Sequence, residues 1–270
     1  MPHDLLPDPP QRRPRPSGEP GQDIVRRKRR DEQGGLPPWY APLPAPRWVR
    51  SEEATHMRPE DPVLCLALNG GAWALPWWVM KNHHVANLEL NGKAVLVTLC
   101  EMCTSSGAFD PVIDGRRRLF RLEGIYNGTI MPTDDETGSL WTGFTGESFE
   151  GPLKGTVMPR LPLVQCTWEE WSGLHPDTLV ADGEGEPRDG HGEGHTPGSP
   201  ALFPGMRGLL SNVDQRLHHY ELVLGVFAGG AARCYPLSAL ALHGPALNDA
   251  LGGEEIAVFC LPGSWIAIAY

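Results

Sequence analysis

The sequence predicts an α+β fold that is predominantly β, and three observations support this. First, VLCLAL at 63–68 and AVLVTL at 94–99 are apolar runs of strand length, typical of buried strands. Second, FDPVIDGRRRLFRL turns at Asp114 and Gly115, a pair that supplies the positive φ angles of a tight hairpin. Third, one pattern of strands and a short helix recurs later in the chain, so we expect two related halves around a mixed or barrel-like sheet.

Short helices and a last strand complete the predicted elements. One helix is expected after Pro76, and a second over TWEEW, where Thr167 and Glu170 have the spacing of a capping box. The final residues, WIAIAY, predict an ordered strand.

Composition divides the chain into a tail and one domain. Residues 1–47 are rich in Pro and carry the basic runs RRPRP and RRKRR, so we expect a disordered tail that contributes nothing to the core. Residues 48–270 form the predicted β-rich domain. Within it, residues 182–200 are mostly Gly, Pro and acid, which indicates a flexible surface loop.

The internal repeat has a fixed offset of 160 residues and relates 62–110 to 222–270. The identical pairs include residues with special backbone or chemical roles, namely Gly, Pro, His and Cys. They are Val63/Val223, Leu64/Leu224, Gly70/Gly230, Ala72/Ala232, Pro76/Pro236, His83/His243, Ala86/Ala246, Gly92/Gly252 and Cys100/Cys260. If the two units pack about a pseudo-twofold axis, His83 and Cys100 could face His243 and Cys260.

Charge and hydropathy exclude some classes of function. The formal net charge is −10, yet the first 50 residues hold ten Lys or Arg against six Asp or Glu, so the remainder is strongly acidic. An acidic body argues against nucleic acid as a partner, since binding needs Lys and Arg to displace phosphate counterions. The sequence has no apolar run long enough for a membrane span and no secretory signal, so we expect a cytoplasmic protein.

The stretch VLVTLCEMCTSSGAFD places Cys100 and Cys103 at the end of a predicted strand. The other cysteines are Cys65, Cys166, Cys234 and Cys260, and we expect Cys65, Cys166 and Cys234 to be small buried hydrophobes. A Cys-x-x-Cys pair can supply two thiolates to a tetrahedral metal site. The first hypothesis is therefore a zinc or copper(I) site of Cys100 and Cys103, completed by His83 and by His243 or Cys260, in a metal-binding protein or a metalloenzyme.

Two other hypotheses remain open. Cys100 could be a nucleophile or redox thiol, with His83 as its base and Cys103 as the resolving thiol. Exchange chemistry of the thioredoxin type is less favoured, because Thr104 to Gly107 make a poor helix start. The third hypothesis is a binding module for a small molecule, with an aromatic-lined pocket; the sequence names neither a substrate nor an oligomeric state.

A carboxylate cluster lies in DDETGSLW, from Asp134 to Trp141. Asp134, Asp135 and Glu136 could bind a hard cation or act as paired carboxylates, and the alternative is a solvated turn.

These motifs, in their order, resemble a bacterial family known as "domain of unknown function 3179". The stretches that carry the resemblance are LPWWVMKNHHVAN, LNGKAVLVTLCEMC, GAFDPVIDG, DDETGSLW, EGPLKG and TWEEWSGLHPDT. The resemblance runs over about 61–180 and resumes through the second copy of the repeat. It implies no established reaction, but it marks His83, Asn87, Cys100 and Cys103 as positions that match the family pattern.

The chain departs from that pattern at three places. His84 stands where the family has Glu, Leu99 stands for Tyr, and Glu101-Met102 replace Pro-Leu between the cysteines. A Glu general base is thus absent, which leaves His84 as a supporting residue. Many members look exported or lipid-anchored, in contrast to the cytoplasmic location that the sequence favours here.

Overall fold

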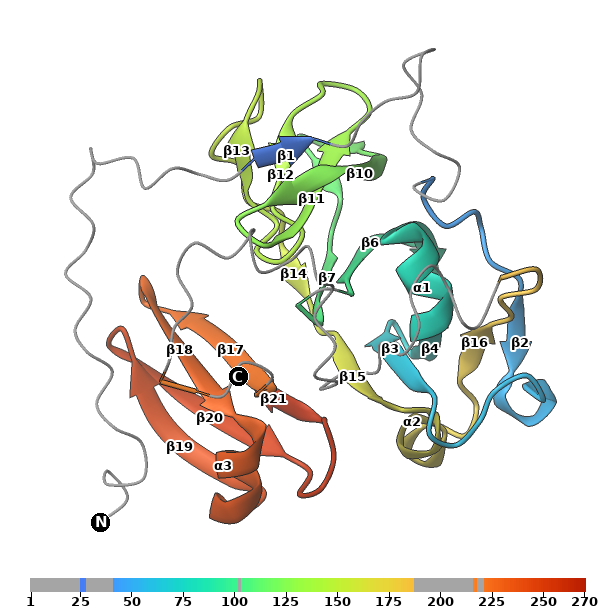
Figure 1. Cartoon of the computed structure of the whole chain (residues 1–270), viewed down its shortest axis with the longest axis vertical. Coiled ribbons are helices and arrows are strands. Elements are labelled where there is room, and N and C mark those ends of the chain that lie inside the picture. The colour runs from blue at the N-terminus through green and yellow to red at the C-terminus, as the bar shows by residue number, and fades with distance from the viewer. Residues whose placement is uncertain (1–24, 28–40, 102, 187–215, 218–220) are drawn as a thin grey trace.

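The computed structural model describes residues 25–27, 41–101, 103–186, 216–217 and 221–270, and these form a predominantly β protein with three short α-helices (Figure 1). The prediction of a predominantly β fold is confirmed. A single mixed or barrel-like sheet is not seen; the described strands are divided among several sheets.

A five-stranded sheet contains the first hairpin of the domain. Its strands in spatial order are β15 (Val164–Thr167), β3 (Pro62–Leu68), β4 (Gly71–Pro76), β16 (Leu179–Ala181) and β2 (Trp48–Arg50). All neighbours are antiparallel except β4 and β16, which run parallel. A 3-10 turn, Ser51–Glu53, follows β2.

A four-stranded antiparallel sheet carries the two thiols. Its order is β14 (Arg160–Leu161), β7 (Ser105–Phe109), β6 (Lys93–Cys100) and β5 (Val85–Leu90). Cys100, the last residue of β6, pairs with Ser105, the first residue of β7.

A third sheet has five strands. It consists of β1 (Val25–Arg27), β10 (Phe120–Tyr126), β11 (Thr129–Asp134), β12 (Leu140–Trp141) and β13 (Ser148–Glu150). The hairpin of β8 (Val112–Ile113) and β9 (Arg116–Arg117) precedes β10. Asp114 and Gly115 have φ of 51° and 72° in its turn, which confirms the hairpin prediction.

The C-terminal residues form a separate group of strands, coloured orange in Figure 1. β17 (Val223–Ala228) pairs with β18 (Ala231–Pro236), and β19 (Ala246–Leu251), β20 (Glu254–Cys260) and β21 (Ala267–Ala269) form a second sheet. The predicted last strand is therefore confirmed. A small core of their own contains Val226, Tyr235, Leu240, Leu251, Ile256 and Val258.

The three α-helices each have seven residues and lie where the sequence predicts or repeats a helix. α1 (Trp77–His83) begins after Pro76 and ends at His84, whose φ is 65°. α2 (Trp168–Leu174) has the predicted capping box of Thr167 and Glu170. α3 (Leu237–His243) begins after Pro236, the counterpart of Pro76. Among the described residues, no helix has both the length and the apolar run that a membrane span requires.

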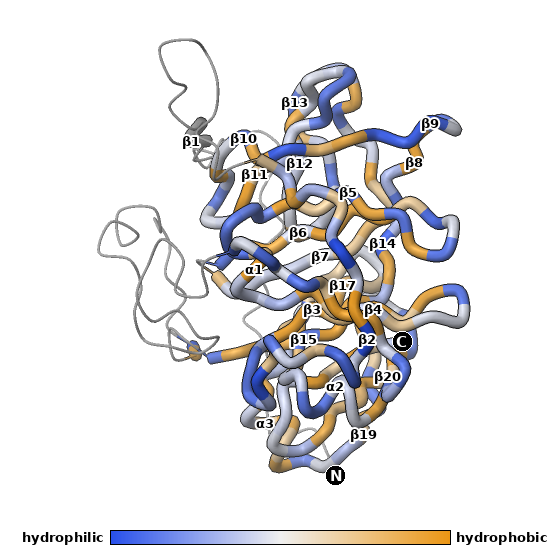
Figure 2. The backbone as a smooth tube through the Cα atoms, turned by 90° about the vertical axis from the view of Figure 1, so that its right-hand side faces the viewer, coloured by the Kyte–Doolittle hydropathy of each residue, from blue (hydrophilic) through white to orange (hydrophobic). Residues whose placement is uncertain are grey.

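The hydrophobic residues follow this layout. Figure 2 shows apolar segments running through the central strands, with polar segments at the outer turns. One core cluster joins α1 to β3, β4, β5 and β6, and includes Leu64, Trp77, Met80 and Leu99. A second cluster joins the four-stranded sheet to the third sheet, and it buries Cys100 with Phe120, Ile130 and Trp141.

The two segments of the internal repeat have the same order of elements, two strands, a helix and two strands. The pairing of β3 with β4 equals that of β17 with β18 at an offset of 160: Leu64 faces Leu75, and Leu224 faces Tyr235. The second hairpins differ, because β19 and β20 turn at Gly252 and Gly253, one residue later than the offset requires. That the segments are copies of one unit stays a prediction.

Two expectations about burial need correction. Leu43, placed in the tail, is 7% exposed and packs in the first core cluster, because its backbone forms a parallel bridge with Ala86. Cys234 is exposed rather than buried, since it lies on the outward face of β18. Cys65 and Cys166 are buried as expected. Most of the tail, and the predicted loop from residue 187 onward, lie outside the described residues.

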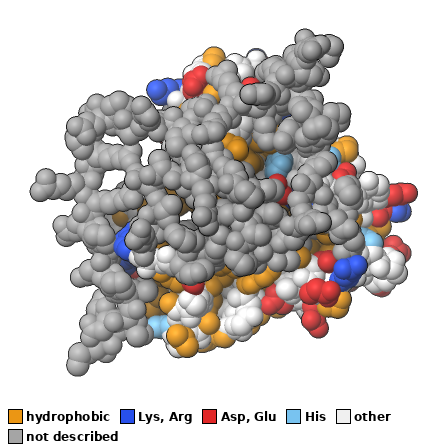
Figure 3. All heavy atoms as spheres, viewed as in Figure 1, with side chains coloured by type: hydrophobic (Ala, Val, Ile, Leu, Met, Phe, Trp, Pro, Cys, Tyr) orange, Lys and Arg blue, Asp and Glu red, His pale blue; other side chains and the backbone are white. Residues whose placement is uncertain are grey.

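The acidic balance is visible on the surface. In Figure 3, Asp and Glu side chains gather at the lower right, over the part of the molecule where Figure 1 places α2.

Candidate functional site: the Cys100 and Cys103 thiols

The two thiols lie where β6 turns into β7, and they differ in exposure. Cys100 ends β6 and is 1% exposed, because it packs into the cluster between two sheets. Cys103 lies in the turn and is exposed. The pair therefore combines one exposed cysteine with one buried cysteine.

Hydroxyl groups surround the sulfur of Cys103. Its Sγ atom lies 2.9 Å from Oγ of Ser105, and that oxygen lies 3.3 Å from Oγ1 of Thr129. Thr129 is brought there by the β10–β11 hairpin, whose turn residues Asn127 and Gly128 both have positive φ. An Asn-Gly turn of this kind fixes the register of the two strands and so places Thr129 at the start of β11.

The pKa of Cys103 is lowered to about 6 by these contacts. The largest cause is a hydrogen bond from the Cys100 thiol, and hydrogen bonds from Ser105 and Thr129 act in the same direction. Although the residue is exposed, neighbouring atoms crowd its sulfur, and this desolvation opposes the lowering. The lowered pKa favours the thiolate form of Cys103 near neutral pH.

The pKa of Cys100 moves the other way and is raised well above its ordinary value. The first cause is its hydrogen bond to Cys103, and burial adds to it. Backbone hydrogen bonds from Cys103 and Ile130 oppose the rise. The two opposite shifts favour a state in which Cys100 keeps its proton and Cys103 is the thiolate.

The side chain of Gln165 holds the turn between β6 and β7 in place. Gln165, on β15, donates from Nε2 to the carbonyl of Thr104 at 3.0 Å and to Oγ of Ser106 at 2.8 Å. The Oε1 atom of Gln165 accepts from Nε1 of Trp77 at 3.3 Å. One amide thus ties the thiol turn to the five-stranded sheet and to the start of α1.

His83 has partners other than a thiol. Its Nδ1 lies 2.8 Å from the carbonyl of Ala41, and its Nε2 lies 2.9 Å from Oε1 of Glu186. The other oxygen of Glu186 accepts from Nδ2 of Asn82 at 2.9 Å. Since each ring nitrogen already has an oxygen partner, the geometry gives no support to His83 as the base for Cys100.

His84 and Asn87 link backbone segments. The backbone carbonyl of His84 accepts a hydrogen bond from the backbone N–H of Leu99. The ring Nδ1 of His84 lies 3.2 Å from the carbonyl oxygen of Leu99. Asn87 pairs both ways with the backbone of Phe120, at 2.8 and 2.9 Å, and so joins β5 to β10 in the manner of a strand partner. These contacts assign both residues to the framework of the site.

His243 and Cys260, the counterparts of His83 and Cys100 in the internal repeat, lie in the C-terminal group of strands, β17 to β21. His243 ends α3 and is exposed, and the thiol of Cys260 donates to the carbonyl of Gly244 at 3.2 Å. Burial raises the pKa of Cys260. The described part of the chain holds no group of three or more His, Cys, Asp or Glu side chains that could hold a metal ion. In the described residues, His83, His243 and Cys260 are thus not gathered with Cys100 and Cys103 into one group of ligands.

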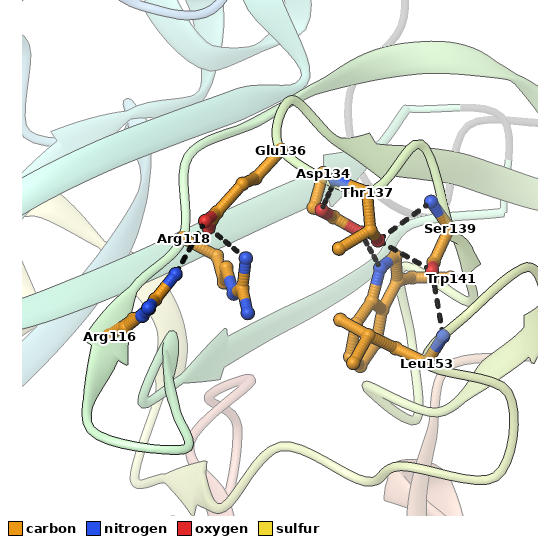
Figure 4. Close-up of polar contacts among 8 residues, drawn as sticks. All are labelled: Arg116, Arg118, Asp134, Glu136, Thr137, Ser139, Trp141 and Leu153. Atoms are coloured by element: carbon orange, nitrogen blue, oxygen red, sulfur yellow. Dashed lines mark hydrogen bonds and ion pairs between the residues drawn. The ribbon is translucent and has the colours of Figure 1, made fainter.

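The acidic stretch from Asp134 to Glu136 is not a wholly solvated turn, because its carboxylates bond to other groups of the protein (Figure 4). Asp134 is fully buried, and its carboxylate accepts from Thr137 N at 2.7 Å and from Trp141 Nε1 at 3.1 Å. Asp135 pairs instead with Arg121 at 2.6 Å, and Glu136 pairs with Arg116 and Arg118. The three carboxylates thus serve three separate structural contacts.

Trp141 connects this turn to the thiol cluster. It is fully buried, packs edge to face on Phe120 with ring centroids 5.6 Å apart, and belongs to the same core cluster as Cys100. The bond between Asp134 and Trp141 therefore stabilises the core cluster against which Cys100 packs.

Sequence reasoning missed several residues of the site. Ser105 was detectable, because it lies two residues after Cys103. Thr129, Gln165 and Glu186 were not, since no local pattern relates them to the cysteines or to His83.

Comparison with known families agrees with this set of motifs. A family model described as "Protein of unknown function (DUF3179)" matches residues 41–267. The chain belongs to this family. The matched residues include every described residue of the thiol site. No curated protein and no solved structure matches the chain.

Proposed function

We propose that this DUF3179 member is a thiol–disulfide oxidoreductase or redox-sensing protein in which Cys103 is the attacking thiol and Cys100 the resolving thiol. The observation that carries the proposal is the asymmetric pair at the end of β6, with an exposed, hydroxyl-bonded Cys103 and a buried Cys100. This reverses the roles expected from the sequence, where Cys100 was the reactive thiol.

The proposed reaction begins with the thiolate of Cys103 and a substrate disulfide. The thiolate attacks one sulfur of that disulfide, a mixed disulfide forms, and the other substrate sulfur leaves as a thiolate that takes up a proton. An attacking thiol with a pKa near the ambient pH is the most effective, and Cys103 fits this requirement.

Cys100 then completes the exchange. The main cause of its raised pKa is the hydrogen bond to Cys103, and this contact with a thiolate is lost when Cys103 enters the mixed disulfide. Cys100 then loses its proton more readily, attacks Sγ of Cys103 and releases the second substrate thiol. The substrate disulfide gains two electrons, and the two cysteines become a disulfide.

The chemistry does not need a helix. In Cys-x-x-Cys motifs the thiolate is often stabilised at a helix N-terminus, whereas Cys103 precedes β7 and is stabilised by Cys100, Ser105 and Thr129. Thr104 to Gly107 do not begin a helix that could stabilise the thiolate. In this proposal the hydroxyl groups of Ser105 and Thr129 stabilise it instead.

Trapping of the mixed disulfide tests the proposal. Reduced protein is mixed with glutathione disulfide, quenched with acid, and analysed by mass spectrometry. We expect wild type to yield the Cys100–Cys103 disulfide, and Cys100→Ala to accumulate glutathione on Cys103. The matched variant Cys103→Ala should accumulate little on buried Cys100. Equal modification in the two variants would overturn the proposal, as would stoichiometric zinc or copper that both thiols retain.

A further inference from the structure

A second pair of thiols lies in the core between β3 and β15. The Sγ atoms of Cys65 and Cys166 are 3.8 Å apart, and both residues have no exposed surface. They lie on different strands from Cys100 and Cys103, and the exchange chemistry proposed above does not use them.

The register explains the contact. On the antiparallel strands, Cys65 faces Val164 and Cys166 faces Val63, so the two cysteines are diagonal neighbours. Side chains two residues apart on a strand share a face, which places all four in one core cluster. The thiols therefore meet across the strand pair.

We propose that Cys65 and Cys166 are a disulfide-forming pair, which closes when the chain folds in the presence of a small-molecule disulfide. One cysteine attacks the oxidant, for example glutathione disulfide, and releases one glutathione. The other loses its proton, attacks the mixed disulfide and releases the second glutathione. Two protein thiols are oxidised, and one glutathione disulfide is reduced to two thiols.

The geometry predicts a reversible bond rather than a permanent one. Diagonal neighbours lie about 7–8 Å apart between Cα atoms in a regular sheet, whereas a disulfide usually spans about 4.4–6.8 Å, so closing the bond requires the two strands to move slightly toward each other. Closing the 3.8 Å gap to a bond of about 2.05 Å strains the strand pair. A strained disulfide is more readily reduced than an unstrained one.

Burial decides when the bond can form. In the folded protein Cys65 has no exposed surface, so an external oxidant cannot reach it. Burial raises the pKa of this thiol as well, which keeps it protonated and unreactive. Oxidation should therefore be fast during folding and slow afterwards.

The test uses the full chain with Cys100→Ser and Cys103→Ser, so that the exposed pair cannot contribute. The reduced chain is refolded in a glutathione redox buffer, and free thiols are alkylated before digestion without reductant. We expect a linked peptide of Cys65 and Cys166 that dithiothreitol removes. Protein that is folded first and then exposed to the same buffer should acquire the link at least tenfold more slowly.

The matched control adds Cys166→Ala to the same background and should lose the link without joining Cys65 to Cys234 or Cys260. Tryptophan fluorescence checks that each chain has refolded. The main result comes from the chain that carries only Cys100→Ser and Cys103→Ser, in which Cys65 and Cys166 are unchanged. Refolded protein with both thiols alkylated, or with Cys65 linked to another cysteine, would overturn the proposal.

Discussion

The Sγ atom of Cys103 lies 2.9 Å from Oγ of Ser105, at the first residue of β7. A hydroxyl group at this position can donate to a thiolate and stabilise it without a helix or a cation. Together with the proton held by Cys100, this contact makes the exposed thiol acidic.

Replacing Cys100 by Ala should raise the pKa of Cys103, because the Cys100 thiol is the largest cause of the lowering. The rate of alkylation of Cys103 by iodoacetamide, followed by mass spectrometry, should then rise with pH at a higher midpoint than in wild type. At pH 6.5 we expect a loss of roughly tenfold in rate. An unchanged midpoint would mean that Cys100 does not stabilise the thiolate.

Ser105→Ala should raise the pKa of Cys103 in the same direction but by less, since Ser105 comes after Cys100 among the causes. The control is Ser106→Ala, which removes a hydroxyl that accepts from Gln165 and is not a cause of the shift. The two variants are compared by alkylation at pH 6.5. Equal losses would show that the turn is merely disturbed.

The thiolate also couples pH to stability. The ordinary pKa of a cysteine is 9.0, and in the folded chain that of Cys103 is about 6, so folding favours its deprotonated form. This contribution is fully present above pH 9, declines as pH falls, and is lost below about 6. The free energy of unfolding of reduced wild type, minus that of Cys103→Ala, should therefore increase from pH 5.5 to 8 in urea titrations. A flat difference would contradict the lowered pKa.

Asp134→Ala should destabilise the fold by about 2 to 4 kcal/mol, because the backbone N–H of half-buried Thr137 and the indole N–H of buried Trp141 lose their acceptor. The neighbouring Asp135→Ala removes a half-exposed carboxylate paired with Arg121 and should cost less than about 1 kcal/mol. Urea denaturation measures both. Similar costs would show that the Asp134 carboxylate is not a structural anchor.

Local signals in the sequence predicted part of the secondary structure. Asp114 and Gly115 turn their hairpin, and Thr167 and Glu170 cap α2, because each of these contacts lies within a few residues. The cysteine pair was also found from its spacing. Its chemistry was not, because it depends on where distant strands meet.

Two contacts illustrate this limit. Thr129 lies 24 residues from Ser105, and Glu186 lies 103 residues from His83, and neither partner has a pattern of its own in the sequence. One hypothesis from the sequence had Cys100 as the reactive thiol with His83 as its base, whereas in the structure Cys103 is the exposed thiol and His83 lies beside the carboxylate of Glu186.

The pH dependence of alkylation at Cys103 in the reduced wild-type protein tests the central proposal most directly. We expect a rate that rises with pH around a midpoint near 6, with Cys100 unmodified over the same time. A midpoint near 9, the ordinary pKa of a cysteine, would contradict the assignment of Cys103 as the attacking thiol.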